Sequence, residues 1–149
     1  MSWLAAIRRY LVAVSLGNLL WEAAQLPLYT LWHTGTPAAL TAAVLHCTAG
    51  DVLIAALTIV AALVVFGSSD WPRAGFARVV LPAVALGLGY TIYSEYMNTA
   101  VRQSWAYSEF MPRLPVIGTG LAPFAQWIVV PPLALVWACR RSGRRDHDV

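Results

Sequence analysis

The chain has 149 residues, of which 59% are hydrophobic and 11% are charged. Soluble domains carry charge on about a quarter of their residues, so this composition is typical of a membrane protein and excludes an ordinary soluble one. The net charge of +3 comes from ten arginines without any lysine; these are too few and too scattered for a nucleic-acid-binding surface, so no nucleic-acid partner is expected.

Four apolar segments follow one another, each close to the length of about 20 residues that a helix needs to cross a bilayer. The first contains polar residues such as Glu22 and lacks a clean cleavage site, so we interpret it as a retained helix and not a signal peptide. Pro123 and Pro131-Pro132 interrupt the fourth, which predicts a kink. The sequence therefore predicts an all-α, polytopic membrane protein: a single domain over residues 1–149, with four transmembrane helices in an up-down bundle at 10–29, 38–66, 79–98 and 118–138, and a basic tail at 140–149.

Arginine is distributed unequally between the two sides of these segments. One side holds only Arg102 and Arg113, whereas the other side holds Arg8, Arg9, Arg73, Arg78, Arg140, Arg141, Arg144 and Arg145. Because positively charged flanks stay in the cytoplasm, both termini are predicted to be cytoplasmic. The chain is then expected to be a multi-pass protein of the plasma membrane, which is the inner membrane if the source is Gram-negative.

Polar and ionisable side chains are concentrated in the outer half of the predicted helices. Glu22, His46, Asp51 and Glu95 come from three of these helices at overlapping depths, with no lysine in the chain to neutralise the carboxylates. An ionisable group in hydrocarbon costs on the order of several kcal/mol unless it is paired or hydrated, so this cluster predicts a functional site with these four as candidate catalytic residues. Candidate substrate-binding residues nearby are Gln25, Tyr90, Ser94, Asn98, Arg102, Arg113 and Gln126.

Two kinds of chemistry agree with this cluster. His46 with Glu22 and Glu95 is an acceptable ligand set for a divalent metal ion such as zinc, manganese or iron, although the sequence has no His-x-x-x-His or Glu-x-x-His spacing. Without a metal, the same carboxyl groups and imidazole could transfer protons as general acids and bases. The sequence leaves both alternatives open.

Residues outside the cluster have simpler interpretations. Arg102 and Arg113 are predicted on the outer side, where they could receive an anionic headgroup or substrate, and pairing of these arginines with Glu109 is the competing explanation. Trp127 is expected near the membrane boundary, where aromatic residues gather. The glycines within the helices are expected to let neighbouring helices approach closely; they are Gly17, Gly50, Gly87 and Gly89.

Three functional classes agree with these features. The first, which we favour, is a membrane-embedded enzyme acting on a lipid or isoprenoid-like substrate by acid/base or metal-assisted chemistry, with the long aromatic loop after the third segment as a lid. The second is a small proton- or cation-coupled transporter or channel-like oligomer, and the third is an accessory subunit of a larger membrane complex. Transport is disfavoured because no carboxylate other than midplane Asp51 and loop Asp70 continues the path inward. Membrane lipid is the expected partner, and a homo-oligomer or larger membrane complex is an alternative.

Overall fold

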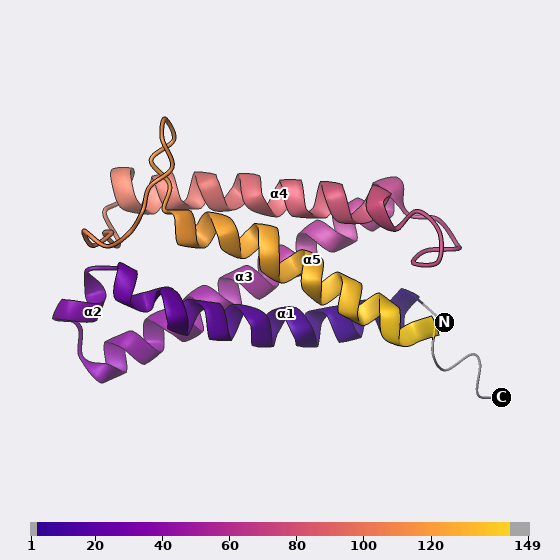
Figure 1. The fold of residues 1–149 in the computed structure, drawn as a ribbon, viewed down its shortest axis with the longest axis horizontal. Coiled ribbons are helices and arrows are strands. Elements are labelled where there is room, and N and C mark those ends of the chain that lie inside the picture. The colour runs from indigo at the N-terminus through magenta and orange to yellow at the C-terminus, as the bar shows by residue number, and fades with distance from the viewer. Residues whose placement is uncertain (1–2, 144–149) are drawn as a thin grey trace.

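The computed structural model describes residues 3–143, which form a bundle of long helices without any strand (Figure 1). In chain order, its elements are α1 (Trp3–Gln25), the 3₁₀ turn η1 (Leu26–Leu28), α2 (Leu31–Thr34), α3 (Pro37–Phe66), α4 (Phe76–Tyr96), the π-helical turn η2 (Met97–Val101) and α5 (Leu121–Gly143). Four segments are long and apolar enough to cross a membrane, namely Trp3–Leu28, Pro37–Phe66, Phe76–Val101 and Leu121–Arg140. The predicted all-α architecture with four transmembrane helices is confirmed.

α1 is longer than predicted, whereas α3, the second of the four long helices, begins where the sequence predicts. α1 begins at Trp3 and not at residue 10, because Arg8 and Arg9 are good helix formers that only fall outside the apolar window. α3 begins within one residue of its predicted start: Pro37 occupies its first turn, and the side chain of Thr36 accepts a hydrogen bond from the backbone N–H of Ala39 at 3.2 Å. Proline at the first position with a threonine cap before it is a standard helix start.

The prolines of the fourth predicted span do not interrupt α5. Pro131 and Pro132 lie inside the helix, which continues to Gly143. Pro123 lies in its first turn, where the missing N–H costs no intrahelical hydrogen bond. Most of the predicted basic tail, including Arg144 and Arg145, lies outside the described residues.

The buried face of α1 changes from apolar to polar along its length. Residues four apart lie on one face of a helix, and the buried residues Ala6, Tyr10 and Val14 are followed on the same face by buried Asn18 and Glu22. Since α1 begins at the end of the bundle where α5 finishes (Figure 1), we call this the terminal end. The opposite end, which holds α2 and residues 102–120, we call the cavity end.

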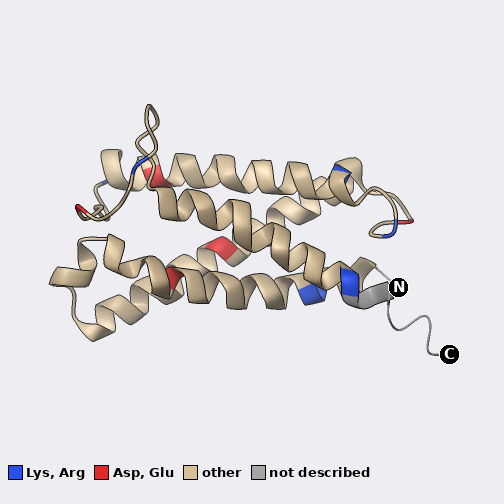
Figure 2. Ribbon diagram, in the orientation of Figure 1, with Lys and Arg blue, Asp and Glu red and all other residues tan. Residues whose placement is uncertain are grey.

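α4 shows the same change at the same level of the bundle. Its buried residues Val79, Ala83 and Gly87 are followed on one face by Thr91 and Glu95 toward the cavity end. Figure 2 accordingly shows acidic segments within the helices of the cavity-end half, and basic segments near the ends of the molecule. The half toward the terminal end is filled by apolar residues, which include Ala55, Ile59 and Ala62 of α3 and Leu135 and Ala138 of α5.

Close helix approach is achieved at two glycines and not at the other two. A Cβ on Gly87 would overlap the indole of Trp127 and lie 2.8 Å from its Cη2, and one on Gly17 would lie 2.7 Å from Cγ1 of Val130. Gly50 and Gly89 have nothing within 4 Å of that position, so the prediction of close approach is wrong for them. Trp127 lies in the protein core and not in a lipid-facing aromatic belt, because its indole packs on Gly87 with 2% of the residue exposed.

Candidate intramembrane site

A cavity of about 480 Å³ lies between all four long helices at the level where their buried faces become polar. Its volume falls in the range of about 300–1,000 Å³ that is usual for sites of small-molecule ligands. The polar side chains that line it include Glu22 and Gln25 of α1, His46 and Asp51 of α3, Thr91 and Glu95 of α4, and Gln126 of α5. Its apolar wall includes Leu26, Leu31, Ala43, Val44, Leu53 and Ile54.

Gln126 connects three helices at the floor of the cavity. Its Nε2 donates hydrogen bonds to Oδ2 of Asp51 at 2.8 Å and to Oδ1 of Asn18 at 3.2 Å. Its Oε1 accepts a longer hydrogen bond of 3.4 Å from Nε2 of Gln25, which also donates to Oε1 of Glu22 at 2.8 Å. Gln126 is 2% exposed, so these contacts hold a buried amide that would otherwise be costly in an apolar bundle.

Glu22 and Asp51 form a carboxyl pair between α1 and α3. Their carboxyl groups are within hydrogen-bonding reach of each other. Two carboxyl groups this close can share one proton, and in that state the pair would hold an acid beside a base. Each group also accepts one amide hydrogen bond, Asp51 from Gln126 and Glu22 from Gln25. One oxygen of each carboxyl group therefore stays available for the shared proton or for a ligand.

Glu95 holds the loop that covers the cavity end. The hydroxyl of Tyr107 donates a short hydrogen bond to Oε2 of Glu95 and accepts one of 3.0 Å from the backbone N–H of Gly120. Burial, together with the hydrogen bond to the nearby Glu95 carboxylate, raises the pKa of Tyr107 well above its usual range. The phenol therefore stays protonated and keeps its role as a donor.

The same loop is attached by backbone hydrogen bonds to η1 and to the residues just after it. The N–H of Thr30 donates to the carbonyl of Ala106 at 3.0 Å, and the N–H of Ser108 donates to the carbonyl of Leu28 at 2.9 Å. The rings of Tyr29 and Tyr107 pack at a centroid distance of 5.5 Å. The loop after α4 is thus fixed over the cavity by contacts at both of its sides, and its opening as a lid stays a prediction.

Two polar atoms of residues that line the cavity, Oε1 of Gln25 and Nε1 of Trp105, lack a hydrogen-bond partner within the described residues. Oε1 of Gln25 is buried and accepts no hydrogen bond there, although the Gln25 side chain lines the cavity and the residue is only 5% exposed. A buried acceptor without a donor is unusual in proteins and suits a site that binds a ligand or water.

The cavity opens through the side of the bundle between α3 and α4. Leu53 and Tyr90 line it from the middle of these helices, yet they are 60% and 51% exposed. Toward the cavity end, α3 has no buried residue before Ala55. Since both helices are long enough to span the membrane, this opening faces acyl chains when the protein is in a bilayer.

The structure brings most of the predicted site residues to this one cavity. The lining includes the four candidate catalytic residues and all but one of the candidate substrate-binding residues, Arg113 being the exception. The two residues that reasoning from the sequence missed and that matter most are Asn18 and Tyr107. Asn18 is four residues before Glu22, a spacing that places them on one face, whereas nothing in the sequence relates Tyr107 to Glu95.

The predicted metal ligands do not form a metal site. No group of three or more His, Cys, Asp and Glu side chains within residues 3–143 is arranged to hold a metal ion. His46 lines the cavity but is exposed on α3, whereas Glu22 is engaged with Gln25 and Glu95 with Tyr107. The two carboxylates named as ligands are thus committed to different partners.

No protein-family model, curated protein or solved structure matches the chain. Evidence for a function of this chain therefore comes from the site itself.

Proposed function

We propose that this protein is a membrane-embedded enzyme that performs acid/base chemistry on a lipid or isoprenoid-like substrate. The observation that carries the proposal is the Glu22–Asp51 carboxyl pair, which is held by buried amides in a cavity with a largely apolar wall. The arginine pattern favours the plasma membrane, with the cavity end on the outer side.

Proton transfer is the chemistry for which this pair is suited. The protonated member can give its proton to the substrate while the ionised member removes one from a neighbouring position. The two transfers balance, so a redox-neutral rearrangement needs no further reactant. Gln25 and Gln126 fix the two carboxyl groups, which lowers the cost of reaching the reactive geometry. The proposal does not require a metal ion, since the described residues do not assemble its ligands.

The shape and lining of the cavity favour an amphipathic substrate. The side opening between α3 and α4 would admit an acyl or prenyl chain, which would contact Leu53, Ile54 and Val44. The polar end of the substrate would reach the partnerless Oε1 of Gln25, which can accept a hydrogen bond from a hydroxyl group.

The transport alternative gains no support from the packing. A proton or cation that crossed this chain would have to leave the cavity through the terminal end. The described core there is apolar, with Tyr10, Val14, Ile59, Val79 and Leu135 fully buried. Charged groups pay a large cost in such surroundings unless paired or hydrated. A path between several copies, and a role as an accessory subunit, stay predictions.

Comparing membrane lipids from cells that express matched variants tests the enzyme proposal. The wild type and Glu109→Gln, which removes an exposed loop carboxyl group, should both change the lipid profile relative to cells without the protein. Glu22→Gln and Asp51→Asn should abolish this change, because either substitution leaves the pair with a single titratable carboxyl group. Each variant should elute from gel filtration in detergent as the wild type does, to show that it is folded.

Two results would contradict the proposal. If expression of the wild type leaves the lipid profile unchanged, the protein does not have the proposed activity. If a folded Asp51→Asn protein is fully active, the carboxyl pair does not have the proposed role. If instead Asp51→Asn is folded and inactive, mass spectrometry of the lipids that co-purify with it should identify the substrate class, because a blocked enzyme with an intact cavity should retain its substrate.

A further inference from the structure

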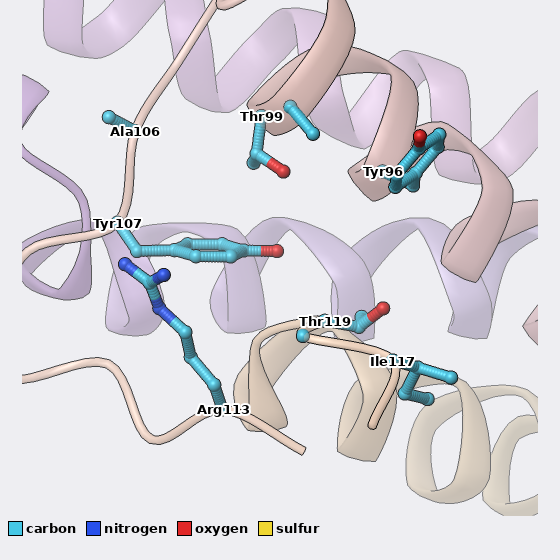
Figure 3. Close-up of a pocket in the computed structure, with 9 residues that line it drawn as sticks. Tyr96, Thr99, Ala106, Tyr107, Arg113, Ile117 and Thr119 are labelled. Atoms are coloured by element: carbon cyan, nitrogen blue, oxygen red, sulfur yellow. The ribbon is translucent and has the colours of Figure 1, made fainter. Parts of the chain in front are cut away.

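A second pocket lies beside the cavity, on the other side of Tyr107. It has a volume of about 340 Å³ and is lined by residues of η2, of the end of α4 and of the loop before α5: Tyr96, Thr99, Ala100, Ala106, Tyr107, Arg113, Ile117, Gly118 and Thr119 (Figure 3). We call it the loop pocket. None of these lining residues is acidic, and one is an arginine.

Arg113 is an exposed residue that lines the loop pocket. Within the described residues it forms no salt bridge with Glu109, so that sequence-based explanation is wrong. Its guanidinium carbon instead lies 5.2 Å from the centroid of the Tyr107 ring (Figure 3). A cation–π contact of this kind uses the charge of the guanidinium group and needs none of its N–H groups, which stay available to donate hydrogen bonds.

The hydroxyl group of Thr119 is a second free donor in the same pocket. Thr119 is 2% exposed, and its Oγ1 has no hydrogen-bond partner among the residues described. The other threonine of the pocket, Thr99, already donates its hydroxyl proton to the backbone carbonyl of Glu95 at 2.7 Å. Thr119 therefore presents a desolvated donor, which costs free energy unless an acceptor occupies the pocket.

We propose that the loop pocket binds a phosphate group, with Arg113 and Thr119 as its main ligands. A positive guanidinium group and a buried hydroxyl group, with no carboxylate among the lining residues, form a site for an anion that accepts several hydrogen bonds. The pocket lies where the span Phe76–Val101 ends, which is the level of lipid headgroups in a bilayer. The phosphate is that of an anionic lipid or of a soluble ion, and the experiment separates the two.

Calorimetric titration of the purified protein in a neutral detergent tests this site. The probes are dihexanoyl phosphatidic acid, dihexanoyl phosphatidylcholine and inorganic phosphate. We expect phosphatidic acid to bind the wild type, and Arg113→Gln to weaken this binding about tenfold or more, as the loss of a charge-assisted hydrogen bond does. Thr119→Val, which keeps the shape of the side chain, should weaken it about fivefold, the effect of one neutral hydrogen bond.

Matched controls assign the effect to this pocket. Arg102→Gln removes an exposed arginine that lines the cavity and not the loop pocket, so it should leave the affinity unchanged, and Arg113→Lys should restore part of it. Glu22→Gln should bind phosphatidic acid like the wild type, so this test is independent of the proposed enzymatic activity. If Arg113→Gln fails to fold, Thr119→Val decides alone.

The soluble probe distinguishes the source of the phosphate. Competition by millimolar inorganic phosphate would show that the phosphate group alone is bound, and its failure to compete would show that the lipid is needed. The proposal is overturned if phosphatidic acid binds no more tightly than phosphatidylcholine, if Arg102→Gln weakens binding as much as Arg113→Gln, or if folded Thr119→Val binds like the wild type.

Discussion

Replacing Gly87 with alanine should destabilise the bundle, whereas the same replacement at Gly89 should not. Both glycines lie within α4. Alanine is favoured over glycine within a helix by about 0.5–1 kcal/mol, so this gain is common to both variants. The difference between them comes from the space around the new methyl group, which the structure gives for each position.

At Gly87 the methyl group would overlap the indole ring of Trp127, with one ring carbon 2.8 Å away. Trp127 is 2% exposed, so its ring cannot swing aside without moving α5. Overpacking of this kind costs about 1–3 kcal/mol, sometimes more. At Gly89 nothing lies within 4 Å. The two variants should therefore differ in unfolding free energy by about 1–3 kcal/mol, with Gly87→Ala the less stable.

Thermal unfolding in one detergent, followed by circular dichroism, measures this difference. For a chain of this length each kcal/mol corresponds to about 2–4 °C in Tm, so a gap of several degrees is expected. Because Gln126 directly precedes Trp127, Gly87→Ala should also disturb the Gln126–Asp51 hydrogen bond. Equal Tm values for the two variants would refute the packing inferred between α4 and α5.

Three further predictions concern the cavity and its loop. Gln126→Leu should lower the unfolding free energy by about 1–3 kcal/mol, because it removes the hydrogen bonds that Gln126 makes with Asp51, Asn18 and Gln25. Denaturation in mixed micelles measures the loss, and a stability equal to that of the wild type would contradict the role of the network. Gly50→Leu should reduce the amount of lipid that co-purifies with the protein at unchanged Tm, because Gly50 lines the cavity and no atom lies within 4 Å of its Cβ position. Lipid retained at the wild-type level would show that the cavity is not the binding site. The pKa of Tyr107 is raised in the folded protein. The protonated phenol therefore contributes its full stability below the pKa of a free tyrosine, about 10, and this contribution is lost progressively as the pH rises above that value. Hydrogen exchange of residues 102–120 should therefore accelerate above this pH in the wild type and change less in Tyr107→Phe.

The sequence was sufficient for the four spans and for the level at which polar residues gather. Apolar length fixes the spans, since a helix must match the bilayer thickness. The i, i+4 spacing of Asn18 with Glu22 places both on one face of a helix. Because the cost of polar groups in hydrocarbon forces them toward one another, residues from four helices were expected to meet, and Glu22, Asp51, Glu95 and Gln126 do line one cavity.

Pairwise contacts were beyond the reach of the sequence. Gly50 and Gly87 are both glycines within predicted helices, yet Gly50 borders the open cavity whereas Gly87 lies under the indole ring of Trp127. The difference arises because tertiary packing sets the rotation of each helix about its axis. The hydropathy pattern also placed Trp127 at the membrane boundary, since it does not tell a tryptophan in a core from one in an aromatic belt. The Tyr107–Glu95 hydrogen bond depends on how a loop without periodicity folds back.

The opening between α3 and α4, with Leu53 and Tyr90 at its sides, affects how any activity should be measured. A molecule that reaches the cavity from the acyl chains never partitions into water, so its relevant concentration is its mole fraction in the bilayer. Diluting the substrate with inert lipid should slow turnover even when the total amounts of substrate and protein are constant. Diluting the same vesicles with buffer should leave the turnover of each protein molecule unchanged.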